Sequence, residues 1–175
     1  MELFDLYTRE RVPTGKTITR GENIPQGYYH IAVHVCIFSK DGRMLIQRRQ
    51  PFKSGWSGMW DVSVGGSAVA GETSQQAAER EVFEEIGYAL SLDDARPIIT
   101  VHFEKGFDDI YTVERDIDIS SLRLQYEEVH SVKWATADEI KSMIDEGIFI
   151  PYHRELIDLL FFMRNHRGTF VRDEN

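Results

Sequence analysis

The chain has 175 residues, of which 42% are hydrophobic and 28% are charged, which is typical of a soluble globular protein. Its formal net charge of -9 argues against a nucleic-acid backbone or an anionic membrane as the main partner, but leaves a small phosphate ligand possible. The single cysteine, Cys36, excludes an internal disulfide, and no segment has the pattern of a signal peptide or a membrane span. We therefore expect a cytoplasmic protein.

Strand patterns dominate the first part of the chain. A short strand is expected over 2–7, followed by a polar, turn-rich lead-in or flap over 8–27. β-Branched and aromatic residues predict a strand over 28–38, and an Asp-Gly turn predicts that 44–49 returns beside it as a hairpin. Another short strand is expected over 60–64.

Helices and strands alternate in the middle of the chain. A helix is predicted over 73–86, and Gly87 is typical of the residue that ends a helix. The strands that follow are expected over 98–103, 110–117 and 129–134.

Two more helices are predicted near the C-terminus. Thr136 and Glu139 have the spacing of a capping box, which predicts a helix to about Glu146. A last helix is expected to begin after Pro151 and to reach Gly168. Mixed strands with helices between and after them predict a layered αβ domain.

Three glutamates are crowded into one face of the helix predicted over 73–86. On a helical wheel, Glu81, Glu84 and Glu85 fall within an arc of about 100°, beside an apolar stripe that can face the core. Their mutual repulsion and their unfavourable place near the helix C-terminus would both be relieved by a divalent cation such as Mg²⁺, which prefers oxygen ligands. A solvated acidic surface is the competing interpretation.

The residues around these glutamates favour the metal-binding interpretation. Gly65 and Gly66 end a strand and allow backbone shapes that other residues resist, so a bare carbonyl there can add one more oxygen ligand. Arg80 lies one turn before Glu84 and can hold its carboxylate. Glu72, ahead of the helix, can pair with Arg80 or reach a metal-bound water.

The spacing of these residues resembles the Nudix box. Gly66, Glu72 and the run REVFEEIGY over 80–88 match its fixed polar and glycine positions, and only Tyr88, where an aliphatic residue is usual, departs from it. The resemblance covers about residues 28–165.

This resemblance implies an α+β fold, the Nudix αβα sandwich around a mixed β-sheet, with 1–175 as a single Nudix hydrolase domain and 1–27 as a lead-in strand and loop packed on it. It also implies a hydrolase that cleaves diphosphates with Mg²⁺ or Mn²⁺. The implied metal ligands are the Gly65 carbonyl, Glu81, Glu84 and Glu85. The residues implied to support the site are Gly66, Glu72 and Arg80.

Nudix enzymes often use a further glutamate from outside the box as a ligand or a base. Glu127 and Glu128 lie where such a residue often occurs, and Glu114 is the other candidate. We take Glu128 as the catalytic candidate beside the three helix glutamates. An ordinary surface role remains the alternative for each of these residues.

A second resemblance connects residues 30–66 to isopentenyl-diphosphate isomerases, which share the Nudix fold. Arg49 and Lys53 fall where those enzymes place cations for the substrate diphosphate, so both are candidate substrate-binding residues. However, Gly65 stands where the isomerases have a catalytic cysteine, and Ser67 replaces their usual histidine. The sequence is therefore identified as an isomerase-like member of the Nudix hydrolases.

Other conspicuous residues are expected to be structural. Trp56 and Trp60 can wall a pocket, but packing around the site is favoured. His30 and His34 are spaced to share one strand face, and packing is favoured over a metal site. The apolar run over 156–163 is expected to pack as helix core, and any exposed part of it can serve a homodimer interface.

The leading hypothesis is metal-dependent hydrolysis of a diphosphate bond in a nucleoside diphosphate derivative or another small organic diphosphate. An isoprenoid diphosphate isomerase is disfavoured by the missing cysteine. A nucleotide-sensing module without turnover is disfavoured because it would not need the three intact glutamates.

Overall fold

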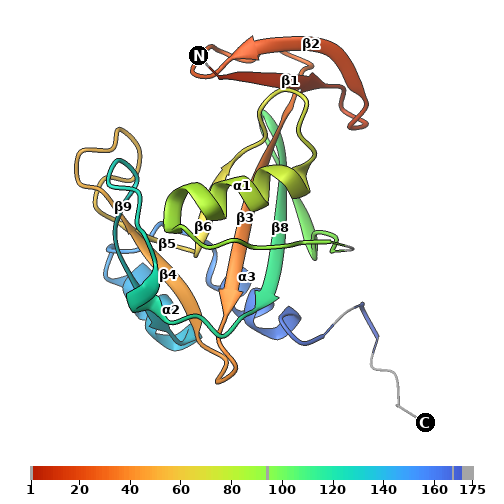
Figure 1. Cartoon of the computed structure of the whole chain (residues 1–175). Helices are drawn as coiled ribbons and strands as arrows, with labels where there is room; N and C mark the ends of the chain where they lie inside the picture. Colours follow the sequence, from red (N-terminus) through yellow and green to blue (C-terminus); the bar gives the residue numbers. More distant parts are fainter. Residues whose placement is uncertain (1, 94, 167, 171–175) are drawn as a thin grey trace.

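The computed structural model describes residues 2–93, 95–166 and 168–170. Figure 1 shows the course of the chain. Its elements are, in order, β1 (Leu3–Tyr7), β2 (Pro13–Thr19), β3 (His30–Phe38), β4 (Met44–Arg49), β5 (Trp60–Asp61), β6 (Val64–Ser67), α1 (Ser74–Ile86), β7 (Ile99–Phe103), β8 (Gly106–Glu114), the 3₁₀ turn Ile119–Ser121, β9 (Val129–Ala135), α2 (Ala137–Asp145) and α3 (Arg154–Met163).

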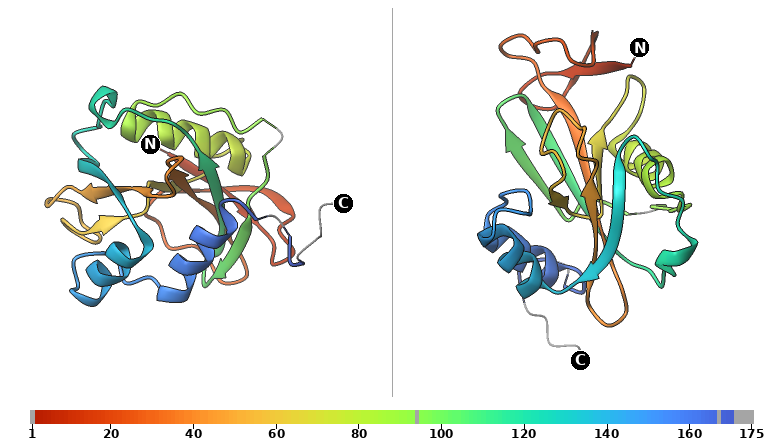
Figure 2. Two further views of the ribbon diagram at one scale, coloured as in Figure 1. Left: turned by 90° about the horizontal axis from the view of Figure 1, so that it is seen from below. Right: turned by 90° about the vertical axis from the view of Figure 1, so that its left-hand side faces the viewer.

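A mixed sheet forms the middle layer of the fold. Its strand order is β5-β4-β3-β8-β7, with β6 beside β3 and β9 beside β4, and β3 runs parallel to β8. Helix α1 covers one face of the sheet, while α2 and α3 cover the other, as the right-hand view of Figure 2 shows. Each face buries its own apolar cluster. The expected α+β sandwich around a mixed sheet is confirmed.

The sheet opens into a fork between β3 and β4. These strands are paired only beside their connecting turn, and β6 takes the place of β4 along the rest of β3. Ser63 bridges the fork, because its hydroxyl accepts a hydrogen bond from the Ile37 N–H and donates one to the Leu45 carbonyl. The single strand expected over 60–64 is therefore wrong: the chain crosses the fork at Ser63 and leaves β5 on β4 and β6 on β3.

A separate hairpin of β1 and β2 lies over one end of the sheet (Figure 1). Phe4 stacks on His30 of β3 with ring centroids 5.2 Å apart, and Arg11 forms an ion pair with the buried Asp109 of β8. The lead-in over 8–27 thus contains a strand that its polar pattern did not predict, and this strand is held against the sheet through β1.

Most other elements begin and end within two residues of their expected limits, and the capping box of Thr136 and Glu139 is confirmed. Two expected limits are wrong. The strand expected over 110–117 lies closer to the N-terminus, because β8 pairs in parallel with the full length of β3. Helix α3 ends at Met163 and does not reach Gly168, since the polar residues after Met163 offer no further apolar face.

Within the described residues, no helix is long and apolar enough to cross a membrane. Leu159 and Phe162 of α3 are 39% and 55% exposed, so part of this helix faces outward. A homodimer through this surface stays a prediction.

Candidate active site

Helix α1 presents its three glutamates at different depths. The helix starts at the capping box of Thr73 and ends at Gly87, whose left-handed φ of 69° lets the backbone turn away. Glu81 and Glu85 lie one turn apart and are buried, whereas half of the Glu84 side chain (50%) is exposed. Two of the three carboxylates are therefore buried, and they lie deeper than expected for a helix face at the edge of the core.

The paired glycines of β6 lie directly against this helix face. A Cβ atom on Gly66 would lie 2.6 Å from Cγ of Glu81 and closer still to its carboxyl group, so glycine leaves the room that this glutamate needs. The next residue, Ser67, has its backbone N–H 3.4 Å from a carboxylate oxygen of Glu81 and donates to it. Strand β6 thus both accommodates Glu81 and orients it.

Arg80 ties the carboxylates of the site together. Its guanidinium donates to both oxygens of Glu72, at 2.8 and 3.0 Å, which is a bidentate pairing. It also donates to Glu84 at 3.0 Å and to the Ser67 carbonyl at 3.0 Å, and it lies 3.0 Å from Glu81. The hydrogen bonds to Glu72 are the main reason that the pKa of Arg80 rises. The expected pairing of Arg80 with Glu72 and Glu84 is present.

Glu85 is the most deeply buried carboxylate of the three. Burial raises its pKa to about 8, against the effect of a 2.9 Å hydrogen bond from Gln47 and with a smaller contribution from repulsion by Glu81. Burial also raises the pKa of Glu81. Carboxylates in such surroundings become stable anions when a cation joins them.

The donor set fits a hard divalent cation by its chemistry. The carboxylates of Glu81, Glu84 and Glu85 and the backbone of Gly65 border one cavity, and Mg²⁺ and Mn²⁺ prefer oxygen ligands. In the described part of the chain, no three acidic, histidine or cysteine side chains already converge as a finished metal site. Because Arg80 engages two of the glutamates, a cation would have to draw them away from its guanidinium.

We predict that the metal-free protein becomes less stable as the pH rises. Folded Glu85 has a pKa of about 8 compared with an ordinary value of 4.5, so its protonation stabilises the fold fully below pH 4.5, and this stabilisation is lost as the pH rises to about 8. The free energy of unfolding should fall by roughly 2–4 kcal/mol over this range. Urea unfolding in a chelator measures it, and equal stability at pH 5 and pH 8 would contradict the prediction.

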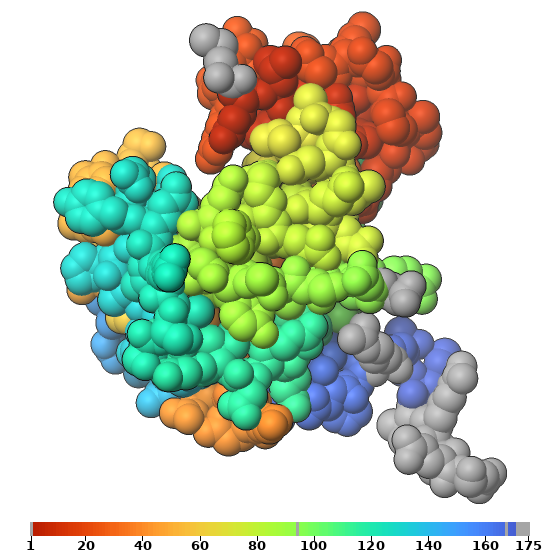
Figure 3. All heavy atoms as spheres, viewed as in Figure 1, coloured from red at the N-terminus to blue at the C-terminus, as the bar shows by residue number. Residues whose placement is uncertain are grey.

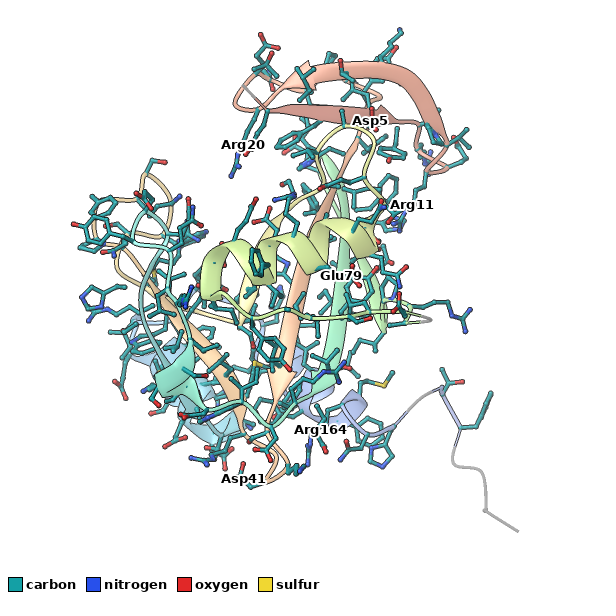
Figure 4. The ribbon with its side chains drawn as sticks, in the orientation of Figure 1. Asp5, Arg11, Arg20, Asp41, Glu79 and Arg164 are labelled. Carbon is teal, nitrogen blue, oxygen red and sulfur yellow. The ribbon has the colours of Figure 1, made fainter. Side chains whose placement is uncertain are left out.

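A polar cavity of about 140 Å³ opens where α1 faces the fork of the sheet and the β1–β2 hairpin; we call it the phosphate cavity. Its lining includes the three helix glutamates, the glycine pair and the cations Arg20, Arg49, Lys53 and Arg80, together with Glu2, Gln125 and Glu128. Figure 3 shows the surface hollowed between the hairpin, α1 and the segments near residues 50 and 125. Figure 4 shows Arg20 directed from the hairpin toward this hollow.

Besides Arg80, two of these cations are held by carboxylates. Lys53 donates to Glu128 at 2.6 Å, and Arg20 donates to Glu2 at 2.6 Å. Sequence reasoning missed Arg20 and Gln47. The turn-rich segment around Arg20 has no sequence pattern that indicates a binding residue. Gln47, in contrast, is a polar residue inside the apolar strand β4, and this position could have indicated its role.

Of the three glutamates considered outside the helix, the structure brings only Glu128 to the phosphate cavity. Glu127 is its exposed neighbour and does not line the cavity. Glu114 is exposed at the last position of β8, opposite Phe38, and it does not line the cavity either.

A second cavity of about 580 Å³, which we call the sheet cavity, lies on the far side of the glycine pair from α1. Four polar side chains meet at its floor. Asp108 of β8 lies 2.8 Å from Nδ1 of His34 on β3, and the Tyr152 hydroxyl donates to Asp61 of β5 at 2.8 Å. Burial opposes protonation of His34, but Asp108 and Asp61 outweigh it, so the pKa of His34 is raised.

The residues expected to be structural divide into two groups. Trp60 packs beneath Lys133, whose Nζ lies 4.7 Å from the ring, and His30 packs on β1, both as expected. Trp56 does not: it is 52% exposed and lines the sheet cavity, because its loop extends beyond the sheet. His34 is also not simply packed, since it contacts a carboxylate in that cavity.

Gly65 is required by its neighbour across the sheet. A Cβ atom on Gly65 would lie 2.8 Å from Cδ2 and 2.9 Å from Nε2 of His34, so a cysteine does not fit here while His34 keeps its place. Cys36 is fully buried, and burial raises the pKa of its thiol. Neither position supplies the thiol that carbon protonation by an isomerase would need.

Comparison with known proteins agrees with this geometry. The NUDIX domain family model matches residues 28–160. A Nudix hydrolase of Listeria monocytogenes is 46% identical over 165 residues, which are 94% of this chain and 96% of that protein. An isopentenyl-diphosphate Delta-isomerase of Salmonella typhi is 28% identical over 130 residues, which are 70% of this chain and 69% of that protein.

The fold is found in solved structures as well. A protein of Deinococcus radiodurans superposes with a TM-score of 0.72 at 24% sequence identity, covering 91% of this chain and 97% of that one. The family match spans well over half of this chain, and the Listeria relative is similar along almost its whole length. The chain therefore belongs to the Nudix family and is a hydrolase.

Proposed function

We propose that this hydrolase cleaves the diphosphate bond of a nucleoside diphosphate derivative or another small organic diphosphate, with Mg²⁺ or Mn²⁺ as its cofactor. The observation that carries the proposal is the phosphate cavity of about 140 Å³, whose lining combines the three helix glutamates and the glycine pair with four cationic side chains, Arg20, Arg49, Lys53 and Arg80. A diphosphate needs both kinds of partner: protein cations bind its outer oxygens, and carboxylates bind it through a shared metal.

The helix and the glycine strand would hold the metal. Glu81, Glu84, Glu85 and the Gly65 carbonyl are its proposed ligands, and a bound Mg²⁺ or Mn²⁺ would neutralise phosphate charge and lower the pKa of the attacking water. Arg80 orients Glu81 and Glu84, which it contacts at 3.0 Å each.

The remaining residues of the cavity act on the substrate. Arg49 and Arg20 bind the phosphate oxygens, and Arg20 exchanges its contact with Glu2 for the substrate. The oxygen of the attacking water bonds to one phosphorus, and the bond between that phosphorus and the bridging oxygen breaks. Glu128, held by Lys53 at 2.6 Å, accepts the proton of the water. Each product keeps one phosphate group.

Release of phosphate-containing products tests this function directly. Wild type and Glu85→Gln are assayed with and without Mg²⁺ on nucleoside diphosphate derivatives, dinucleotides and isoprenoid diphosphates. Metal-dependent cleavage that the variant lacks would support the proposal. Isomerisation of an isoprenoid diphosphate without cleavage would replace it with the isomerase, and tight binding without any turnover would replace it with the sensor.

Arg49→Ala should mainly weaken substrate binding. Loss of a charge-assisted hydrogen bond to phosphate costs about 1.5–3 kcal/mol, which corresponds to an increase of roughly 10- to 100-fold in KM, with a smaller change in kcat. Arg48→Ala is the matched control, because Arg48 is the neighbouring cation on β4 but lines neither cavity. Steady-state kinetics measures both variants, and an equal rise of KM in the two would remove Arg49 from the substrate site.

A further inference from the structure

The sheet cavity is positioned to receive the part of the substrate that lies beyond the diphosphate. Arg49 and the glycine pair line both cavities, so the two spaces adjoin there. Arg49 is the only lysine or arginine among the described residues that line the sheet cavity. A substrate whose phosphate lies beside Arg49 can therefore extend its organic group into the sheet cavity, whose volume of about 580 Å³ is within the range for small-molecule sites.

The floor of the sheet cavity offers hydrogen-bond acceptors. Oδ1 of Asp61 accepts a hydrogen bond from Tyr152, and Oδ1 of Asp108 contacts His34. In both aspartates, Oδ2 accepts no hydrogen bond from a described residue. Asp61 is only 5% exposed, but its second oxygen is not among the buried atoms without a partner, so it stays open to a ligand or a water in the cavity. Two aspartates beside one histidine also disfavour a second anionic group at this floor.

The rim of the sheet cavity offers flat apolar surfaces. Trp56 and Phe103 line the cavity while 52% and 40% of their surfaces remain exposed. Trp56 also has a φ of 50°, in a region that is unfavourable for a bulky residue and is kept where the surroundings require it. Exposed aromatic faces of this kind stack on planar rings such as nucleobases.

Combining the floor with the rim, we infer that the sheet cavity binds the base of a nucleoside diphosphate derivative and selects bases that carry an exocyclic amino group. The base lies against Trp56, and its amino group donates to the free Oδ2 of Asp108 or Asp61. An oxo group at the same position would place an acceptor against a carboxylate, and an isoprenoid chain would leave both aspartates without a donor. This inference rests on the proposed diphosphate hydrolysis, because the phosphate at Arg49 determines where the base goes.

Nucleotide pairs that exchange the exocyclic amino group for an oxo group, with the adjacent ring nitrogen changing from an acceptor to an N–H donor, test the selection. Cytidine and uridine 5′-diphosphates form one pair, and adenosine and inosine 5′-diphosphates form the other. We expect kcat/KM with Mg²⁺ to favour the amino member of at least one pair by about tenfold or more. Calorimetric binding of the same nucleotides to Glu85→Gln should give a similar ratio without depending on turnover.

Variants of the floor and the rim should separate the two contributions. Asp108→Asn presents an amide that can donate to an oxo group, so it should reduce the preference for the amino nucleotide to about threefold or less. Its control is Glu104→Gln, which removes a charge from the nearby exposed turn and should leave this preference unchanged. Trp56→Ala should weaken binding of both members about tenfold without changing their ratio. Phe52→Ala is its control, since Phe52 is an exposed aromatic residue of the same loop that lines neither cavity.

The possible results distinguish this inference from the proposed function. Metal-dependent cleavage with equal kcat/KM for amino and oxo members would overturn the inference and leave the hydrolase function standing. Absence of cleavage, with amino-selective binding that Asp108→Asn abolishes, would overturn the proposed function and support the assignment of the cavity. A preference for sugar or isoprenoid diphosphates over every nucleotide would overturn the inference outright.

Discussion

Glu85→Gln is expected to lower kcat by at least about a hundredfold while it stabilises the metal-free protein at pH 8. The substitution removes a negative charge from the proposed metal site, and loss of a single group that stabilises transition-state charge commonly has an effect of this size. The gain in stability comes from burial: an ionised Glu85 is costly in this surrounding, whereas a glutamine is neutral at every pH. Phosphate release and thermal unfolding measure the two effects.

The side chain that faces Glu85 strengthens this expectation. Gln47 donates its amide N–H to Glu85 at 2.9 Å, but its own carbonyl oxygen is buried without a partner among the described residues. A glutamine at position 85 keeps an oxygen that can accept the hydrogen bond from the Gln47 amide N–H. It also adds an N–H that can donate to the Gln47 carbonyl oxygen. Glu155→Gln, an exposed change on α3, should alter neither property. Wild-type turnover in both Glu85→Gln and Glu84→Gln would exclude the helix glutamates from the mechanism.

Local sequence patterns predicted the part of the site that one segment builds. The capping threonine, the apolar stripe and the terminal glycine define α1, and the spacing of Arg80 and the three glutamates determines how they meet at one end of that helix. The contact of Arg80 with Glu72 follows from the same short stretch. Because these interactions join residues within a few turns of one another, their spacing in the sequence is sufficient to predict them.

The sheet cavity could not be predicted in this way. Its floor joins His34, Asp61, Asp108 and Tyr152, and the bond between His34 and Asp108 spans 74 positions of the sequence. Parallel pairing of β3 with β8 brings His34 and Asp108 together, while Asp61 comes from β5 and Tyr152 from the segment before α3, and no single segment encodes this arrangement. The strand break at Ser63 was missed for a similar reason, since it depends on bonding to two strands that diverge.

Gly66→Ala should reduce turnover by about a hundredfold or more through displacement of Glu81, one of the proposed metal ligands. The new Cβ would lie 2.6 Å from Cγ of Glu81 and closer still to its carboxyl group, so that side chain must leave its place beside Ser67. Loss of one ligand should also weaken Mn²⁺ binding in calorimetry by at least tenfold. Gly55→Ala is the control, because a Cβ there meets no atom within 4 Å, and its turnover should equal that of wild type.

A double-mutant cycle identifies the cause of this effect. If the clash with Glu81 is responsible, Gly66→Ala should destabilise the wild-type protein but cost almost nothing in a Glu81→Ala background, where the obstructing atoms are gone. Thermal unfolding of the four proteins provides this coupling energy without requiring activity. An equal cost in both backgrounds would mean that Gly66 is needed for its backbone and not for the space it leaves. The glycine pair would then support β6 itself, and the position of Glu81 would have to be explained by Arg80 and Ser67 alone.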